Sequence, residues 1–160
     1  MKHSILLDTS FFIRLLNVED RLHKNAVAYY KYFLENEYVL KVSTISIAEY
    51  CVKGKLNELP LRNIQIIPFN LDHAQRTGEF AKIIFRENNI SQEKLMPRAI
   101  IPNDSKLFSQ ADLGQTVTYF VTSDIRSKKT YSKLCVGLTP KFKIIDIEKP
   151  YDETFGILDL

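Results

Sequence analysis

Long hydrophobic runs are missing from this chain of 160 residues, and their absence excludes several classes of protein. No stretch approaches the roughly 20 consecutive apolar residues that a transmembrane helix needs. The first apolar run, residues 4–7, stops at Asp8, whereas a secretory signal needs a longer apolar core followed by a small-residue cleavage site. We therefore expect a cytoplasmic protein that does not enter a membrane.

Cysteine and histidine are also scarce. The two cysteines, Cys51 and Cys135, lie far apart in the sequence and in no metal-binding spacing. We expect them to be buried or half-buried thiols in a reducing compartment. Because no histidine or cysteine has the spacing of a zinc site, the sequence gives no support to a zinc centre.

A strong excess of one charge is the third missing feature. The formal net charge of +3 permits a nucleic-acid partner but does not require one. Apolar residues make up 45% of the chain and charged residues 26%, which is ordinary for a globular protein with a real core. The length and the absence of repeats or linkers predict one domain over residues 1–150, with residues 151–160 as a C-terminal tail.

What the sequence does contain is an alternation of short apolar segments and amphipathic ones. The periodicity predicts strands over residues 4–7, 38–43, 64–69, 116–122 and 143–147. It predicts helices after Thr9, over 19–36, after Thr44, over 71–86 and from Pro102, with residues 88–104 otherwise mostly loop. Strands that alternate with helices favour parallel pairing through right-handed crossovers. The expected fold class is α/β, a three-layer α/β/α sandwich around a mostly parallel sheet.

Two details of these helices can be checked directly against a structure. Hydroxyl residues are candidate N-caps, namely Thr9 and Ser10 for the first helix and Thr44 and Ser46 for the third. The helix over 71–86 is expected to turn a set of apolar residues inward, namely Ala74, Phe80, Ala81, Ile84 and Phe85.

Four acidic residues follow or begin these predicted elements. Asp8 and Asp124 each follow a strand, Glu49 lies on the helix after the second strand, and Asp104 is near the start of a helix. In a parallel sheet such residues are candidates for one edge, where ligands bind. Clustered carboxylates repel one another, and a divalent cation removes that penalty. Oxygen-only ligation favours Mg²⁺ or Mn²⁺ over softer metals.

The segments that carry these acids resemble those of the PIN-domain nucleases. ILLDTSFFIRLL is similar to the family's opening strand and Asp, and STISIAEY to its second segment; NDSKLFSQA and FVTSD are similar to the third and fourth. The four segments occur in the family's order and span roughly residues 3 to 147. Each acid alone has a plainer interpretation, as a helix cap or a solvated helix residue.

The resemblance implies a metal-dependent endoribonuclease that hydrolyses the phosphodiester bonds of RNA. It further implies that Asp8 and Asp104 are the closest metal ligands, that Asp124 completes the site, and that Glu49 binds metal through water or positions the nucleophile. Asn103 stays open as the ligand in a shifted register, because the loop before Asp104 is longer than in compact members. Phe108 stands where family members often have a small residue.

The compact single-domain form most resembles the toxin nucleases of bacterial toxin–antitoxin pairs. Such proteins usually form homodimers and are inhibited by a small antitoxin protein, so the resemblance implies both kinds of partner in addition to RNA.

Residues around the fourth acid are candidates for substrate binding. Arg126, Lys128 and Lys129 belong, with Lys133, to a basic cluster that can hold RNA phosphates. The alternative for this cluster is a solvated helix face. Thr9 or Ser123 could hydrogen-bond a carboxylate or a phosphate, although capping is the ordinary role for Thr9.

Two other classes of protein compete with the nuclease interpretation. A phosphatase of the haloacid dehalogenase type needs a second Asp two residues after the first, and that position is Ser10. A non-catalytic PIN-like module that binds RNA or a partner protein remains open; the retention of all four acids argues against it.

Overall fold

The computed structural model describes residues 1–91 and 101–157. In this part of the chain, five strands form one parallel sheet in the order β3-β2-β1-β4-β5. The strands are β1 (Ser4–Leu7), β2 (Val39–Ser43), β3 (Ile64–Ile67), β4 (Val117–Thr122) and β5 (Lys143–Asp146). The chain builds outward from β1 to β3 and then returns to the other side of β1 with β4. The order therefore reverses between β1 and β4, and a crevice is expected at their carboxyl ends.

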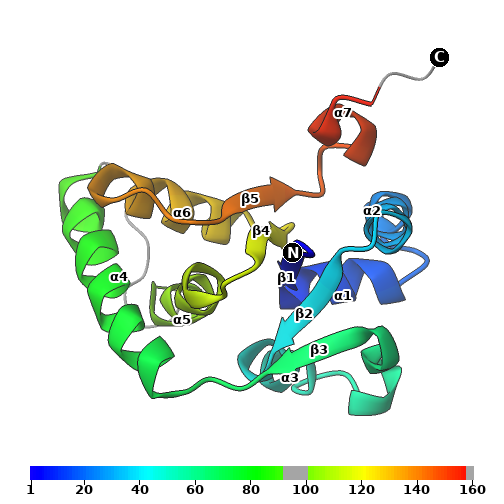
Figure 1. Ribbon diagram of the computed structural model, residues 1–160, viewed down its shortest axis with the longest axis horizontal. Coiled ribbons are helices and arrows are strands. Elements are labelled where there is room, and N and C mark those ends of the chain that lie inside the picture. The colour runs from blue at the N-terminus through cyan, green and yellow to red at the C-terminus, as the bar shows by residue number, and fades with distance from the viewer. Residues whose placement is uncertain (92–100, 158–160) are drawn as a thin grey trace.

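Helices cover both faces of the sheet (Figure 1). One face carries α1 (Thr9–Leu16), α2 (His23–Glu35) and the short α7 (Tyr151–Phe155); the other carries α4 (Leu71–Ile90), α5 (Ile101–Leu113) and α6 (Ile125–Gly137). Between β2 and β3 lie α3 (Thr44–Tyr50), which contacts α1, and the 3-10 helices η1 (Leu56–Glu58) and η2 (Leu61–Asn63). The architecture confirms the predicted α/β/α sandwich.

Alternate residues of β1 supply two separate cores, because successive strand side chains point to opposite faces. Ile5 and Leu7 pack with residues of α1 and α2, whereas Leu6 packs with residues of α4, α5 and α6. Phe108 of α5 is fully buried in the second core. Its ring meets that of Phe120 edge to face, with the ring centroids 5.3 Å apart. The bulky residue is thus accommodated by an aromatic neighbour and does not push α5 away from the sheet.

Several predicted boundaries and faces were wrong in detail. The second helix begins at His23 and not at residue 19, because the preceding residues form turns in which the Asp20 carboxylate accepts the Leu22 N–H. Ala74 and Phe85 of α4 are exposed, since its buried stripe runs through Phe80 and Ile84.

The predicted loop over residues 88–104 overlaps two helices, since α4 continues to Ile90 and α5 begins at Ile101; residues 92–100 lie outside the described residues. The cap of α3 is Ser43, whose hydroxyl accepts the Ile45 N–H at 3.0 Å, and neither Thr44 nor Ser46. Both cysteines, expected to be buried or half-buried, are free thiols on the surface.

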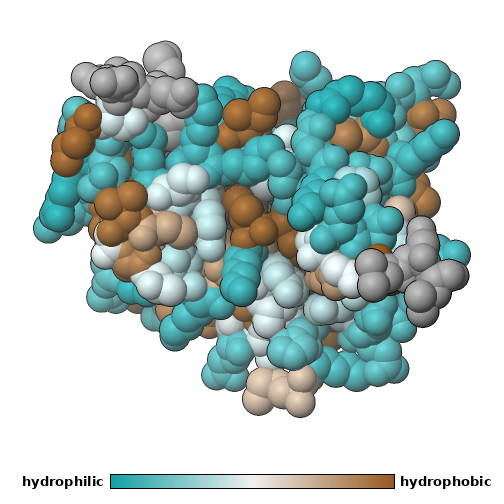
Figure 2. Space-filling view, turned by 90° about the horizontal axis from the view of Figure 1, so that it is seen from above, coloured by the Kyte–Doolittle hydropathy of each residue, from teal (hydrophilic) through white to brown (hydrophobic). Residues whose placement is uncertain are grey.

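Residues 149–155 pack against the first helical layer. The Tyr29 hydroxyl of α2 donates to the Lys149 carbonyl at 2.5 Å, and the Phe155 ring of α7 stacks on Tyr32 with centroids 4.5 Å apart. Figure 1 shows α7 beside α2. Seen from above in Figure 2, the surface is largely hydrophilic, with hydrophobic residues in separate small groups. No helix in the described part of the chain is long and apolar enough to cross a membrane.

Candidate active site

A cavity of about 290 Å³ opens at the carboxyl ends of β1 and β4, where the strand order reverses. All four predicted acids line it. The lining residues are Asp8, Thr9, Ser10, Ile13, Glu49, Asn103, Asp104, Leu107, Asp124, Arg126 and Ser127. Arg126 is the one basic side chain among these described residues. The site therefore has four carboxylates from four separate elements and a single cation to balance them.

Asp8 is fixed at the point where β1 ends. Its backbone N–H donates to the Val121 carbonyl of β4 at 3.0 Å, so the hydrogen bonding between β1 and β4 continues to this residue. The side chain is only 5% exposed. The hydroxyls of Ser10 and Thr122 both donate to its Oδ2 at 2.8 Å. Burial raises the pKa of Asp8 from 3.8 to about 6, with a further contribution from Glu49, although the two hydroxyls act in the opposite direction.

Asp104 lies in the first turn of α5 and is 7% exposed. Two hydroxyls of α6 hold its carboxylate: Ser127 donates to Oδ1 at 2.8 Å and Thr130 to Oδ2 at 2.9 Å. Burial raises the pKa of Asp104 from 3.8 to about 7, and the charges of Asp8 and Asp124 add to this. A carboxyl whose pKa is raised by burial and by like charges is typical of a functional site.

Glu49 of α3 closes the cavity from the side of β2. Its carboxylate accepts the Thr9 hydroxyl at 2.6 Å and the Asn103 amide at 3.3 Å. The expectation that Thr9 caps α1 was therefore wrong, since the helix begins without a side-chain cap and the hydroxyl serves Glu49 instead. Asn103 and Asp104 both reach the cavity, but only Asp104 is buried.

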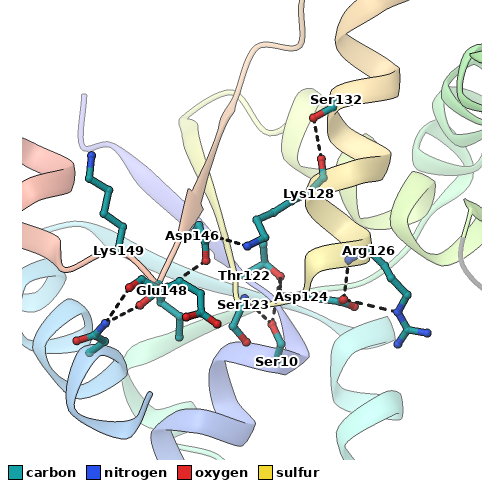
Figure 3. Close-up of polar contacts among 12 residues, drawn as sticks. Ser10, Thr122, Ser123, Asp124, Arg126, Lys128, Ser132, Asp146, Glu148 and Lys149 are labelled. Atoms are coloured by element: carbon teal, nitrogen blue, oxygen red, sulfur yellow. Dashed lines mark hydrogen bonds and ion pairs between the residues drawn. The ribbon is translucent and has the colours of Figure 1, made fainter. Parts of the chain in front are cut away.

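Asp124 caps α6 and faces the cavity at the same time. Its carboxylate accepts the Arg126 N–H at 2.9 Å, and the Arg126 guanidinium lies 3.6 Å away as an ion pair (Figure 3). Its own N–H donates to the Thr122 hydroxyl at 2.9 Å. Thr122 therefore links Asp8 and Asp124 through a single side chain.

The predicted substrate-binding residues do not all lie together. Arg126 lines the cavity, but Lys128 turns toward β5, where its ammonium lies 2.5 Å from Asp146 (Figure 3). Ser123 is 6% exposed and accepts a hydrogen bond from Arg14 at 3.4 Å; it does not line the cavity. Lys129 is exposed and also lies outside the cavity lining.

Four hydroxyl residues that hold the acids were not predicted in this role. They are Ser10 and Thr122 for Asp8, and Ser127 and Thr130 for Asp104. One signal for the second pair was present in the sequence. Ser127, Thr130 and Leu134 are spaced three and four residues apart, which places them on one buried face of α6.

The donors around the cavity are suited to a hard cation. They are carboxylate, hydroxyl and amide oxygens, without imidazole or thiol. In residues 1–91 and 101–157, no group of three His, Cys, Asp or Glu side chains is arranged so that it could hold a metal ion. Mg²⁺ usually keeps several of its waters and needs only one or two carboxylates. The donor set therefore fits a partly hydrated Mg²⁺ or Mn²⁺ ion.

The raised pKa values predict how the stability of the metal-free protein depends on pH. Because the folded protein holds protons on Asp8 and Asp104 more tightly than the unfolded chain does, the free energy of unfolding falls as pH rises from about 4 to about 7. A difference of one pKa unit between the folded and unfolded states is worth about 1.4 kcal/mol, so we expect a loss of several kcal/mol, and each kcal/mol should lower Tm by about 2–4 °C in a chain of this size. Thermal unfolding in EDTA at several pH values measures it. The matched Asp8→Asn/Asp104→Asn protein should show a flatter profile, and parallel profiles for the two proteins would contradict the assignment.

The sheet order, the two helical layers and the acidic cavity at the switch point define a PIN-like α/β fold. No protein-family model and no curated protein sequence matches the chain. Solved structures do match it. A chain of VapBC2 from Rickettsia felis, bound to a DNA fragment from its promoter, is 20% identical with a TM-score of 0.60, over 89% of this chain and 97% of that one.

Two further solved structures agree with the first. A chain of DNA-bound VapBC from Salmonella typhimurium is 16% identical with a TM-score of 0.57, over 91% of this chain and 98% of that one. VapC20 from Mycobacterium tuberculosis, described as a toxin that cleaves the sarcin-ricin loop, is 15% identical with a TM-score of 0.53, over 79% and 94%. At sequence identities of 20% or less, the similarity establishes the fold alone. The predicted resemblance to PIN-domain toxin nucleases is therefore confirmed for the fold.

Proposed function

We propose that this chain is a metal-dependent endoribonuclease that hydrolyses phosphodiester bonds of RNA. The observation that carries the proposal is the convergence of Asp8, Glu49, Asp104 and Asp124 on one cavity that contains a single basic residue. Uncompensated carboxylates in a partly buried site are costly unless a cation neutralises them. The fold is similar to that of VapC20, described as a toxin that cleaves the sarcin-ricin loop, and by analogy this supports the proposal.

Asp8 and Asp104 are proposed to hold the Mg²⁺ or Mn²⁺ ion most directly, with Asp124 completing the site. When bound, such an ion supplies an activated water and neutralises charge on the scissile phosphate. The hydroxyls of Ser10, Thr122, Ser127 and Thr130 keep the two buried carboxylates oriented toward the cavity. Glu49, oriented by Thr9 and Asn103, is proposed to position the attacking water.

A toxin role within a toxin–antitoxin pair extends this proposal. Two of the similar structures are VapBC complexes bound to DNA. By analogy we propose a small antitoxin protein as a partner of this chain, together with a homodimeric state. Co-expression with the product of a neighbouring gene, followed by size-exclusion chromatography with light scattering, tests both.

A second candidate function is a non-catalytic PIN-like module that binds RNA or a partner protein. It is favoured by one observation: the described residues hold no three-ligand group ready for a metal ion. Calorimetric titration with Mn²⁺ separates the two candidates. The nuclease should bind Mn²⁺ in a way that depends on the carboxylates, whereas the binding module should not.

The nuclease proposal predicts an absolute metal requirement. Incubated with total RNA, the purified protein should cleave in Mg²⁺ or Mn²⁺ and should lose activity in EDTA, because the carboxylates alone cannot neutralise a scissile phosphate. Restoring the metal should restore cleavage. Undiminished cleavage in metal-free buffer would rule this mechanism out.

For substrate binding, we propose Arg126, Lys128 and Lys129 as contacts to RNA phosphates. Arg126 has the leading role, because it is the one of these three that lines the cavity. We expect Arg126→Ala to raise KM with a smaller effect on kcat, and to flatten the slope of log affinity against log salt by about 0.7. RNA binding at several salt concentrations measures the slope. Arg62→Ala is the matched control, since Arg62 is exposed and directly precedes β3, whereas the cavity lies at the carboxyl ends of β1 and β4. Equal slopes for the two variants would remove Arg126 from the RNA path.

A further inference from the structure

An apolar groove lies beside the acidic cavity and shares part of its wall. Its volume is about 710 Å³, within the ~300–1,000 Å³ range of ligand pockets. It runs between α1 and α3 and along the turn after α3; the residues that matter here are Ile13, Leu16, Tyr50, Val52, Gly54 and Glu58. Ile13 and Glu49 line both the groove and the acidic cavity. A ligand held at the acids therefore lies next to the groove.

Several apolar side chains of the groove are exposed to solvent. Ile13 is 48% exposed, Leu16 39% and Val52 79%. Single exposed apolar residues are ordinary, but a concave group of them next to a polar site is typical of a binding surface. The basic side chain of Lys53 also lines the groove. The carboxylates of Glu49 and Glu58 line it too, so the groove combines apolar contact area with charged side chains of both signs.

Tyr50 provides a flat surface that is fixed in advance. Its hydroxyl donates to Glu58 Oε2 at 2.8 Å, which holds one end of the ring. The ring also lies against Gly54, where an added Cβ would be 2.3 Å from the ring carbon Cε1. Glycine at this position therefore permits the close approach of the ring. Tyr50 packs in part against the first core but is only half-buried, so a ring held in this way can stack with a ligand at little further cost in side-chain entropy.

We infer that this groove binds the nucleobase of a nucleotide next to the scissile phosphate of a single-stranded RNA. The inference rests on the proposed function, because the phosphate must lie at the acids for the base to reach the groove. Proteins recognise single-stranded RNA largely by stacking unpaired bases on aromatic side chains, and such stacking tolerates any base. Lys53, the one cation among the described residues that line the groove, is placed to contact a phosphate next to that base.

The test uses the full chain in an Asp8→Asn background, which removes cleavage and leaves binding measurable. The probe is a labelled single-stranded RNA that spans a cleavage position mapped with the wild-type protein. We expect Tyr50→Leu, which keeps an apolar side chain but removes the ring, to weaken binding about tenfold in fluorescence anisotropy. Val52→Ser should weaken it by a smaller factor. Val136→Ser is the matched control, since Val136 is 70% exposed on α6 outside the groove, and it should bind like the parent.

A second probe connects the ring to one particular base. An RNA without the base next to the cleavage position should bind the Asp8→Asn parent about tenfold more weakly, and Tyr50→Leu should add no further loss with this RNA. Equal binding of the complete RNA by parent, Tyr50→Leu and Val52→Ser would overturn the inference. It would also be overturned if Tyr50→Leu weakened binding of the RNA without the base as much as it weakened binding of the complete RNA. If the wild-type protein cleaves RNA but these variants bind normally, only the groove assignment is wrong. If it cleaves no RNA at all, the proposed function fails and this inference with it.

Discussion

Asp8→Asn should abolish RNA cleavage while the protein remains folded. The substitution removes a negative charge at nearly constant volume, and the amide oxygen can still accept the hydroxyls that now donate to Asp8 Oδ2. Loss of residues that merely support a metal ligand already costs about 10–100-fold, so loss of a direct ligand should cost more than about 100-fold in cleavage. Single-turnover cleavage in Mn²⁺, with Mn²⁺ affinity measured by calorimetry, tests this.

Stability provides an independent check on the same variant. Burial disfavours the charged form of Asp8, whose pKa is raised to about 6, so the neutral amide should increase the Tm of the metal-free protein at pH 7.5. A variant that is inactive because it is unfolded would show the opposite change. Retention of full cleavage and normal Mn²⁺ affinity by a folded Asp8→Asn protein would remove Asp8 from the site.

The parts of this fold that could be predicted are those determined by local pattern. The residues of β1 are all buried, so a short apolar run marks the strand, and the first polar residue after it marks the sheet edge. The acids could be expected to meet because strands of a parallel sheet present their carboxyl ends at one edge. The boundary of α2 could not be predicted in this way, because it depends on the turn that Asp20 stabilises.

The parts that could not be predicted depend on how helices are rotated and which strands are neighbours. Arg126 and Lys128 are two residues apart and chemically similar, yet one faces the cavity and the other pairs with Asp146. That pair exists because β4 and β5 are paired with Thr122 opposite Asp146, a register that no local pattern encodes. The hydroxyl partners of Asp8 and Asp104 depend in the same way on contacts between segments distant in sequence.

The position of the third acid gives the sharpest remaining test of the site. Asp104 is 7% exposed, is held by two hydroxyls of α6, and has its pKa raised to about 7 by burial and by the charges of Asp8 and Asp124. Asn103 is half-buried and donates its amide to Glu49. These environments favour Asp104 as the metal ligand and Asn103 as a residue that orients Glu49.

We therefore expect unequal effects from two neighbouring substitutions. Asp104→Asn should lower cleavage by more than about 100-fold and weaken Mn²⁺ binding, because it removes a direct ligand at constant volume. Asn103→Ala should lower cleavage by about tenfold or less and leave Mn²⁺ affinity nearly unchanged, because it removes only a hydrogen bond to Glu49. Calorimetry and single-turnover cleavage on both proteins measure the difference, with Tm as the control for folding. Loss of Mn²⁺ binding in Asn103→Ala, with normal binding in Asp104→Asn, would shift the ligand register by one residue and exchange the two roles.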